Sequence, residues 1–300
     1  YTEAMGLTRP SLYFSLLGLA CLGPIAWVLM FGKFGFPEMR AYGSGVATAI
    51  VNWIQALALL WYVARHPVLG FSGQVVRFAA PDAQIIAGLL RLGLPISLAW
   101  SMEAGLFQAC ALLVARFGES WTAAHQVAIN VASLTFMVPL GLSMAVTVRV
   151  GHALGSGSSV DVRRAAGAGL LLGISTQALA CSMMAFGGAF IAGLYLPNDP
   201  LVAATAASLL LLAAIFQFPD GIQVLCAGAL RGLKDTLVPT ICTIIAYWLV
   251  AFPLAYYWCF TLGKGVPSLW WGFTVGLSGA ALMLGARLYF RLRSLGIITA

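Results

Sequence analysis

Residues 201–230 read LVAATAASLLLLAAIFQFPDGIQVLCAGAL, a run in which Asp220 is the only charged side chain. A helix rises 1.5 Å per residue, so about 20 apolar residues cross the roughly 30 Å hydrocarbon core of a bilayer. The run is therefore long enough to span a membrane as a helix. It also places one carboxylate deep inside an apolar segment.

The rest of the chain has the same character. Charged residues make up 8% of the 300 positions, hydrophobic residues make up 61%, and the mean hydropathy is +0.94, far outside the range of soluble globular proteins. We therefore predict an all-α, polytopic membrane helix bundle with the lipid bilayer as its surroundings. The eight candidate spans are Ser11 to Phe31, Tyr42 to Ala64, Ile85 to Ala115, Trp121 to Val148, Ala165 to Leu196, Leu201 to Leu230, Leu237 to Phe260 and Ser268 to Phe290.

The basic residues are distributed unevenly between the two faces of such a bundle. They number 16 against 9 acidic residues, an excess that can indicate nucleic-acid binding. If the spans alternate in direction, however, twelve basic residues fall on one face and four on the other. This is the positive-inside pattern, so we predict cytoplasmic termini for this chain and no nucleic-acid partner. Nearly all of these charges are expected to be solvated or to face lipid, without a ligand.

An internal repeat relates the two ends of the chain. Pro10 and Pro24 recur as Pro239 and Pro253, with the same 14-residue gap and a displacement of 229 residues. Each pair is followed by a turn containing Gly, Lys and Pro and then by a glycine-dotted span. Agreement over a loop and a helix beyond the prolines favours a true repeat.

The repeat predicts how the chain is organised. The second copy begins near Ile85, about 150 residues before Pro239, whereas nine residues precede Pro10. We therefore expect that about four spans precede this sequence and that the complete protein has two parallel units of six helices. The predicted divisions are 1–65, the last two helices of an N-terminal lobe, 66–84, a cytoplasmic inter-lobe linker, and 85–300, a complete six-helix C-terminal lobe.

Two acidic residues stand apart from the other seven. Glu103 and Asp220 lie inside long apolar segments, whereas the rest lie in short polar connections. A carboxylate in a membrane helix costs several kcal/mol, so it normally faces a bundle interior or wet cavity and handles ions, protons or charged ligands. The pair indicates a transporter with a site for a cation or a proton at these acids. The alternative is that both acids only form hydrogen bonds between helices.

Residues near these acids are candidate partners. Ser101 lies close to Glu103 in sequence, and Gln217 and Gln223 each lie three residues from Asp220, on its side of the helix. Aromatic and methionine side chains near the acids can line a cavity that accepts flat organic cations by stacking and cation–π contact. This set comprises Trp100, Met102, Phe107, Phe136, Met137, Phe216 and Phe218.

The sequence offers little support for catalysis or for a transition-metal site. All six cysteines lie within the spans, with no C-x-x-C pair and no histidine at a metal-binding spacing. The sequence also contains no G-x-S-x-G and no H-E-x-x-H motif, and no second His lies near either acid. We predict no enzymatic activity and no cofactor.

Several motifs of this chain form a combination that is specific to one family. They are Gly93-Leu94-Pro95 with Glu103, Ala123-Ala124-His125-Gln126, Arg149-Val150-Gly151-His152-Ala153-Leu154-Gly155, and Asp220-Gly221-Ile222-Gln223 followed by Gly228-Ala229-Leu230-Arg231-Gly232. Together with Thr8-Arg9-Pro10 and Gly32-Lys33-Phe34-Gly35, they resemble the MATE family, the multidrug and toxin extrusion transporters, in its NorM-like bacterial branch. The last two segments are similar to the end of the first lobe of that family, and the resemblance covers essentially all 300 residues.

The resemblance implies a twelve-helix exporter with two six-helix lobes, which exchanges inward sodium or protons for outward small organic cations. It further implies a monomer in the bacterial inner membrane, with the coupling ion in place of any cofactor. Glu103 and Asp220 match the second-lobe acids that bind the coupling cation. Some relatives have a Tyr one turn before the Asp, where this chain has Phe216, so the choice between sodium and protons stays open.

Three other functions remain as alternatives. A lipid-linked precursor flippase of a related superfamily would show more cationic residues along its cavity. A channel would need no paired acids at cavity depth. An intramembrane enzyme would need a nucleophile and base pair, which the sequence does not present.

Overall fold

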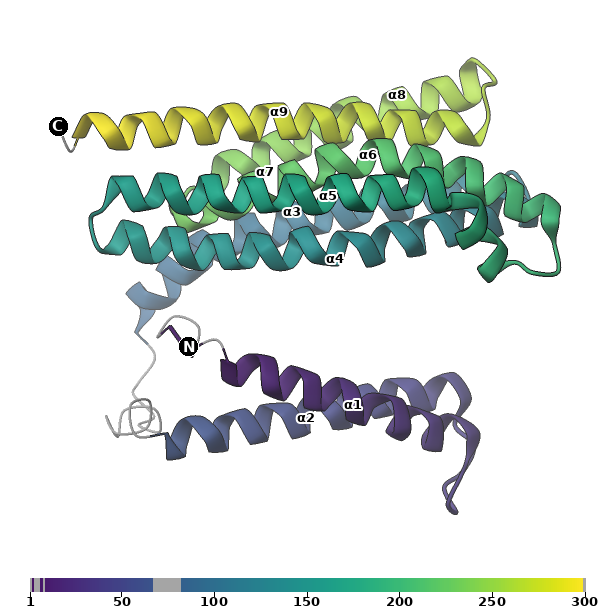
Figure 1. Cartoon of the computed structure of the whole chain (residues 1–300), viewed down its shortest axis with the longest axis horizontal. Coiled ribbons are helices and arrows are strands. Elements are labelled where there is room, and N and C mark those ends of the chain that lie inside the picture. Colours follow the sequence, from purple (N-terminus) through teal and green to yellow (C-terminus); the bar gives the residue numbers. More distant parts are fainter. Residues whose placement is uncertain (1, 3–5, 8, 67–81, 299–300) are drawn as a thin grey trace. The chain divides into compact units, whose positions relative to one another are not determined.

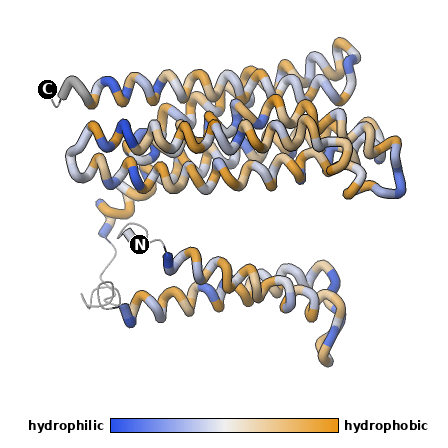
Figure 2. The backbone as a smooth tube through the Cα atoms, in the orientation of Figure 1, coloured by the Kyte–Doolittle hydropathy of each residue, from blue (hydrophilic) through white to orange (hydrophobic). Residues whose placement is uncertain are grey.

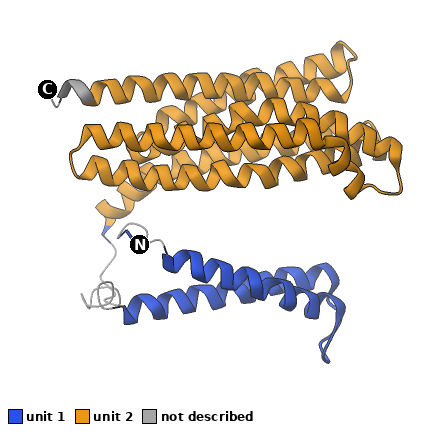
Figure 3. Ribbon diagram, in the orientation of Figure 1, with its two compact units in different colours: residues 1–82 blue, residues 83–300 orange. Residues whose placement is uncertain are grey.

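The computed structural model describes residues 2, 6–7, 9–66 and 82–298. It divides into two compact units, residues 1–82 and 83–300 (Figure 3). Most of the predicted linker, residues 67–81, lies outside the described residues. That the first unit is the end of an N-terminal lobe stays a prediction.

The first unit is a helical hairpin of α1 (Arg9–Phe31) and α2 (Arg40–Arg65) (Figure 1). Gly43 brings the two helices together, since a Cβ atom added there would lie 2.8 Å from the carbonyl oxygen of Leu29. The side chain of Gln55 donates a hydrogen bond of 3.1 Å to the carbonyl oxygen of Phe14. Close approach at Gly43 and the hydrogen bond of Gln55 therefore both contribute to holding the hairpin.

The second unit is a helix bundle in which α6 packs against α4, α5 and α9 (Figure 1). The described part of the chain contains eight helical segments long and apolar enough to cross a membrane, which confirms the predicted all-α membrane bundle. Figure 2 shows hydrophilic residues gathered toward the helix ends and hydrophobic residues along the helices. The elements of this unit are α3 (Ala83–Ala115), α4 (Glu119–Gly155), α5 (Ser159–Tyr195), α6 (Pro200–Gly232), α7 (Leu237–Ile244), η1 (Ile245–Ala251), α8 (Phe252–Tyr256), η2 (Tyr257–Thr261) and α9 (Val266–Ile298).

The seventh span differs from the single regular helix predicted for Leu237 to Phe260. It changes from α-helix to π-helix at η1, returns to α-helix at α8, and becomes π-helical again at η2. Pro253 lies in α8 directly after η1. A proline ring clashes with the carbonyl group four residues earlier, and the wider π-turn accommodates it without ending the helix.

Several helices extend beyond the apolar runs that predicted them. α5 begins at Ser159 rather than near Ala165, because the Ser158 hydroxyl caps it by accepting a hydrogen bond of 3.2 Å from the Asp161 amide. α4 likewise continues to Gly155, beyond the predicted end at Val148. Hydropathy marks the part of a helix that lies in hydrocarbon, whereas capping and turn residues set its ends.

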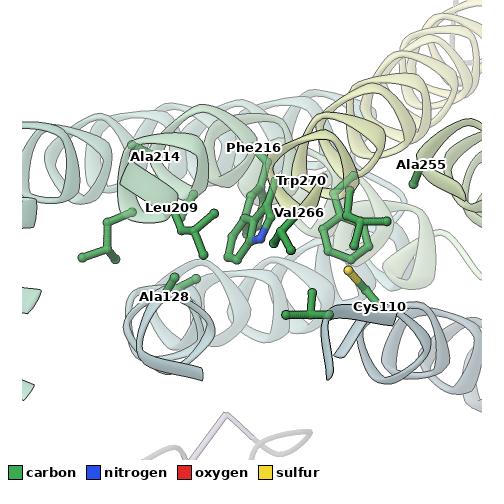
Figure 4. Packing of buried hydrophobic residues seen from close by; sticks show 14 of the residues in the cluster. Cys110, Ala128, Leu209, Ala214, Phe216, Ala255, Val266 and Trp270 are labelled. Atoms are coloured by element: carbon green, nitrogen blue, oxygen red, sulfur yellow. The ribbon is translucent and has the colours of Figure 1, made fainter. Parts of the chain in front are cut away.

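The core of the second unit combines large aromatic side chains with small ones. Phe216 and Trp270 are almost fully buried, with ring centroids 5.6 Å apart, beside Cys110 and Ala128 from other helices (Figure 4). Glycines allow helices to approach elsewhere. A Cβ atom on Gly228 of α6 would lie 2.5 Å from the Ser143 carbonyl oxygen of α4. Close contacts between small residues are typical of membrane helix pairs.

Gly272 of α9 occupies the position equivalent to Gly43 after the 229-residue displacement. A Cβ atom on Gly272 would lie 2.8 Å from the Ala255 Cα atom of the preceding helix. Both glycines therefore sit where their helix meets the one before it, which supports the predicted repeat. The superposition of Ser11 to Ala64 on Leu237 to Phe290 stays a prediction.

Asp235 and two basic residues correct the expectation of solvated surface charges. The Asp235 carboxylate is 8% exposed, 2.8 Å from the Arg287 guanidinium and 3.4 Å from that of Arg291. These contacts join the turn between α6 and α7 to α9. Asp235 lies in a short polar turn, and nothing in the sequence indicated that it would be buried. The arginines that cover it come from a helix about fifty residues further along the chain.

We expect Lys264, two residues before α9, and Arg293, near the end of α9, to lie on opposite sides of the membrane. In a cysteine-free background, a membrane-impermeant thiol reagent should label Lys264→Cys from the periplasmic side and Arg293→Cys from the cytoplasmic side. Labelling of both positions from one side would contradict the predicted topology.

Gly228→Ala should lower the melting temperature in detergent, because the added methyl group would collide with α4. Overpacking of this kind typically destabilises by about 1–3 kcal/mol. Gly167→Ala in α5 is the matched control, since a Cβ atom there meets nothing within 4 Å. Equal melting temperatures for both variants and the parent would show that the contact is not tight.

Candidate functional site

A cavity of about 270 Å³ opens between α3, α4 and α6 in the second unit. Each helix contributes residues at spacings of three or four, the pattern of one helical face. Both acids that the sequence singled out, Glu103 and Asp220, line this cavity. Its lining residues are Trp100, Glu103, Ala104, Phe107 and Gln108 of α3, Ile129, Ala132, Ser133, Phe136 and Met137 of α4, and Phe216, Gln217 and Asp220 of α6.

Asp220 lies at the buried side of this cavity and is short of hydrogen-bond donors. Its side chain is 3% exposed, and its buried Oδ1 atom has no hydrogen-bond partner. The side-chain oxygens of Gln217 and Gln177 are buried without partners as well. Buried polar atoms are nearly always paired, so three orphaned acceptor oxygens in one region are suited to a cation or a proton.

The amide nitrogens of these two glutamines are used within the protein. Gln177 of α5 donates a hydrogen bond of 2.6 Å to the carbonyl oxygen of Gln217. The Gln217 nitrogen donates to the hydroxyl of Thr135 at 3.1 Å and to the carbonyl oxygen of Ala132 at 3.3 Å. Because the nitrogens are engaged in this way, the oxygens are left as acceptors. Gly221 makes room for the Gln177 side chain, which a Cβ atom there would overlap.

Glu103 has a different environment from Asp220. Its half-buried carboxylate lies beside the Gln223 side chain and within electrostatic range of the Arg231 guanidinium. Arg231 also donates a hydrogen bond of 3.2 Å to the Ser143 hydroxyl, which ties its position to α4. Glu103 therefore has a cation and a donor beside it, whereas Asp220 Oδ1 has no hydrogen-bond partner.

A buried tyrosine fixes the orientation of Gln223. The Tyr247 hydroxyl donates a hydrogen bond of 2.9 Å to Gln223 Oε1, which leaves the Gln223 nitrogen to donate toward Glu103. Tyr247 is fully buried and lies in the π-helix η1. Single π-turns inside α-helices are frequent at functional sites, since they redirect side chains. Some relatives have a tyrosine at the position of Phe216. In this chain the phenol near the two acids is that of Tyr247, which comes from the seventh span.

A second, smaller cavity of about 40 Å³ lies on the other side of Glu103, between α3, α6 and α7. Gln223 and Arg231 line it together with the hydroxyl-bearing Thr240 and Thr243. Glu103 and Trp100 line both cavities and therefore lie between them.

The sequence-predicted site residues are only partly brought together. Glu103, Asp220, Gln217, Phe216 and Phe136 line the larger cavity, and Gln223 lines the smaller one beside Glu103.

Ser101 and Met102 line neither of these two cavities. Ser101 is exposed, and the carbonyl oxygen of Met102 accepts a hydrogen bond of 3.1 Å from the indole nitrogen of Trp248. Both residues were predicted to belong to the site because they are close to Glu103 in sequence. They lie on other faces of α3 than Glu103 does.

Three site residues escaped the sequence prediction. Gln177 and Tyr247 are polar groups inside otherwise apolar spans, which was the available signal. Arg231 was assigned to the set of solvated surface charges, although it follows Gln223 by eight residues, a spacing that keeps both on one face of α6. Among the described residues, no group of three or more His, Cys, Asp or Glu side chains forms a candidate metal cluster.

Comparison with known proteins identifies the family. The sequence model of the MatE family matches residues 95–257. The chain is 46% identical over 286 residues to a probable multidrug resistance protein NorM of Xanthomonas campestris, covering 95% of the chain and 62% of that protein. It is 42% identical to multidrug resistance protein PmpM of Pseudomonas aeruginosa, covering 96% of the chain and 61% of that protein. It is 41% identical to multidrug resistance protein NorM of Vibrio cholerae, covering 97% of the chain and 64% of that protein.

Solved structures share the fold. The eukaryotic MATE transporter AtDTX14 matches with a TM-score of 0.84 at 21% identity, over 98% of this chain and 66% of that one. A MATE structure in the bent conformation matches with a TM-score of 0.81 at 18% identity, over 98% of this chain and 64% of that one. These names describe transporters and multidrug resistance proteins, in line with the prediction of no enzymatic activity. The chain spans 61–64% of the length of these curated relatives, and it belongs to the MatE family of transporters.

Proposed function

We propose that this chain forms part of a secondary antiporter that exports small organic cations in exchange for sodium or protons. The observation that carries the proposal is the cavity that Glu103 and Asp220 share, where Asp220 Oδ1 and the side-chain oxygen of Gln217 lack partners. The names of the relatives, which are multidrug resistance proteins, support the same class of function. We further propose a monomer in the bacterial inner membrane, with no cofactor beyond the coupling ion.

The two acids have different roles in this proposal. Asp220 takes the coupling cation, because its Oδ1 atom and the oxygens of Gln217 and Gln177 are unpaired acceptors. Glu103 is the second acid of the site, and it shares the smaller cavity with Arg231 and Gln223, so a positive charge already lies near it. A buried charge without compensation is strongly destabilising, so Asp220 needs a cation or a proton whenever water is excluded from the cavity.

Organic cations fit the rest of the cavity. Phe107, Phe136 and Phe216 present aromatic rings, and Met137 adds an adaptable thioether. A volume of about 270 Å³ lies near the lower end of drug-sized sites. A positively charged, flat molecule can therefore stack on the rings while the acids supply the opposite charge.

Exchange follows if the two ligands favour different states of the protein. A ligand shifts a conformational equilibrium only by its differential affinity for the two states. A coupling cation and a drug cation that both neutralise Asp220 compete for it, and each stabilises the state that binds it better. The alternative function, a lipid-linked precursor flippase, would be favoured by basic residues along the cavity, but the larger cavity has two acids and no basic residue in its lining.

Asp220→Asn and Glu103→Gln should each abolish gradient-driven efflux when the protein is expressed from its complete reading frame and reconstituted in vesicles. Sodium and proton gradients imposed separately identify the coupling ion. Asp199→Asn is the matched control, since it removes a carboxylate at the start of α6 and an asparagine can still cap the Val202 amide. Normal efflux by either cavity variant would remove that residue from the mechanism.

Tyr247→Phe should weaken coupling-ion affinity without abolishing transport, because Gln223 would lose the bond that orients it beside Glu103, which shares the cavity of the proposed cation site at Asp220. A hydrogen bond contributes about 1 kcal/mol, so the half-saturating ion concentration should rise about fivefold. Tyr257→Phe, at a half-exposed position of the same span, should leave it unchanged. An unchanged ion affinity in Tyr247→Phe would show that Gln223 does not depend on this tyrosine.

A further inference from the structure

A separate cavity lies between α4 and α5, and none of its lining residues lines the acidic cavity. Its volume is about 710 Å³, and it opens beside the turn that joins the two helices. α5 begins at this turn, and Arg163 donates a hydrogen bond of 3.3 Å to the carbonyl oxygen of Leu292 near the end of α9. The cavity therefore lies at the end of the bundle that the charge distribution assigns to the cytoplasm. Its lining residues are Leu142, Ala145, Val146, Arg149, His152, Ala153, Ser156, Asp161, Arg164, Ala165, Ala168, Gly169 and Leu172.

One end of this cavity is positively charged. Arg149 and His152 of α4 and Arg164 of α5 converge on it, and Asp161 is the one acidic residue of the lining. The contact between Arg164 and Asp161 is 3.8 Å long and both side chains are mostly exposed, so it is a weak ion pair. Two guanidiniums against one carboxylate leave a net positive charge, and Arg164 is free to turn toward a stronger anion.

The rest of the cavity is an apolar groove. Gly169 and Val146 form its floor, since the two helices are so close there that a Cβ atom on Gly169 would overlap the Val146 side chain. Ala145, Ala168 and Leu172 border the groove and are exposed, as lipid-facing residues are. From His152 to Leu142 the groove runs ten residues along α4, about 15 Å, which is half of the roughly 30 Å hydrocarbon core.

We propose that this groove binds one anionic phospholipid, with the phosphodiester headgroup at Arg149, His152 and Arg164 and an acyl chain along the apolar floor. The length of one lipid leaflet and the order of charge and apolar surface both match the groove. Anionic lipids are enriched in cytoplasmic leaflets, and basic pockets between membrane helices on that side bind their headgroups. The site is independent of the proposed antiport at Glu103 and Asp220.

The test is native mass spectrometry of the detergent-purified protein, expressed from its complete reading frame and titrated with phosphatidylglycerol or with phosphatidylethanolamine of identical acyl chains. Arg149→Gln with Arg164→Gln should weaken phosphatidylglycerol binding about 25-fold, roughly fivefold for each guanidinium near the headgroup. The control, Arg91→Gln with Arg293→Gln, removes the same charge from exposed positions outside the groove. It should weaken phosphatidylglycerol binding less than about twofold. Equal losses in the two double variants would overturn the proposal.

A second pair of variants tests the apolar groove without changing charge. Ala168→Trp fills the groove and should reduce phosphatidylglycerol binding, whereas Ala178→Trp, at an exposed position ten residues further along α5, should not. Inorganic phosphate added to the same samples should fail to displace the lipid. Full displacement by phosphate, or undiminished binding in Ala168→Trp, would show a simple anion site and contradict the lipid assignment.

Discussion

The structure depends on one constraint: a polar group in the interior of a membrane bundle needs a partner, because water is not there to supply one. Most such groups in this chain are paired within the protein. Arg287 covers Asp235, Tyr247 orients Gln223, and the amides of Gln177 and Gln217 donate to neighbouring helices. Asp220 Oδ1 is among the buried atoms that break this rule, together with the side-chain oxygens of Gln217 and Gln177, and the antiport proposal follows from these three acceptors.

The two acids differ because α6 carries different neighbours along one face. Asp220 faces the aromatic cavity, whereas Gln223 and Arg231, further along the helix, reach toward Glu103. Arg231 therefore lies on the side of Glu103, and in our proposal Asp220 is the group that a mobile cation neutralises. The seventh span supplies a phenol to this region, because the π-helical turns around Pro253 include the buried Tyr247. Position 216, by contrast, holds a phenylalanine.

Much of the fold and the two central residues could be predicted from the sequence. Apolar runs of membrane length predicted all eight spans, and the cost of a buried carboxylate singled out Glu103 and Asp220. Features that depend on other helices could not be predicted in this way. Ser101 is near Glu103 along the chain but points away from it, whereas Gln177 is far along the chain and its side chain reaches α6. Helix ends were also missed, because caps such as Ser158 lie outside the apolar runs.

The central claim is that a coupling cation and an organic cation compete for Asp220. Linkage requires that each ligand lower the affinity for the other by the same factor. The most direct measurement is therefore the affinity of the purified protein for a fluorescent organic cation across a series of sodium concentrations and, separately, of pH values. We predict that raising the concentration of one of these two ions weakens binding of the organic cation, and that Asp220→Asn removes this dependence. An affinity that is unaffected by both ions, or a dependence that persists in Asp220→Asn, would contradict the account.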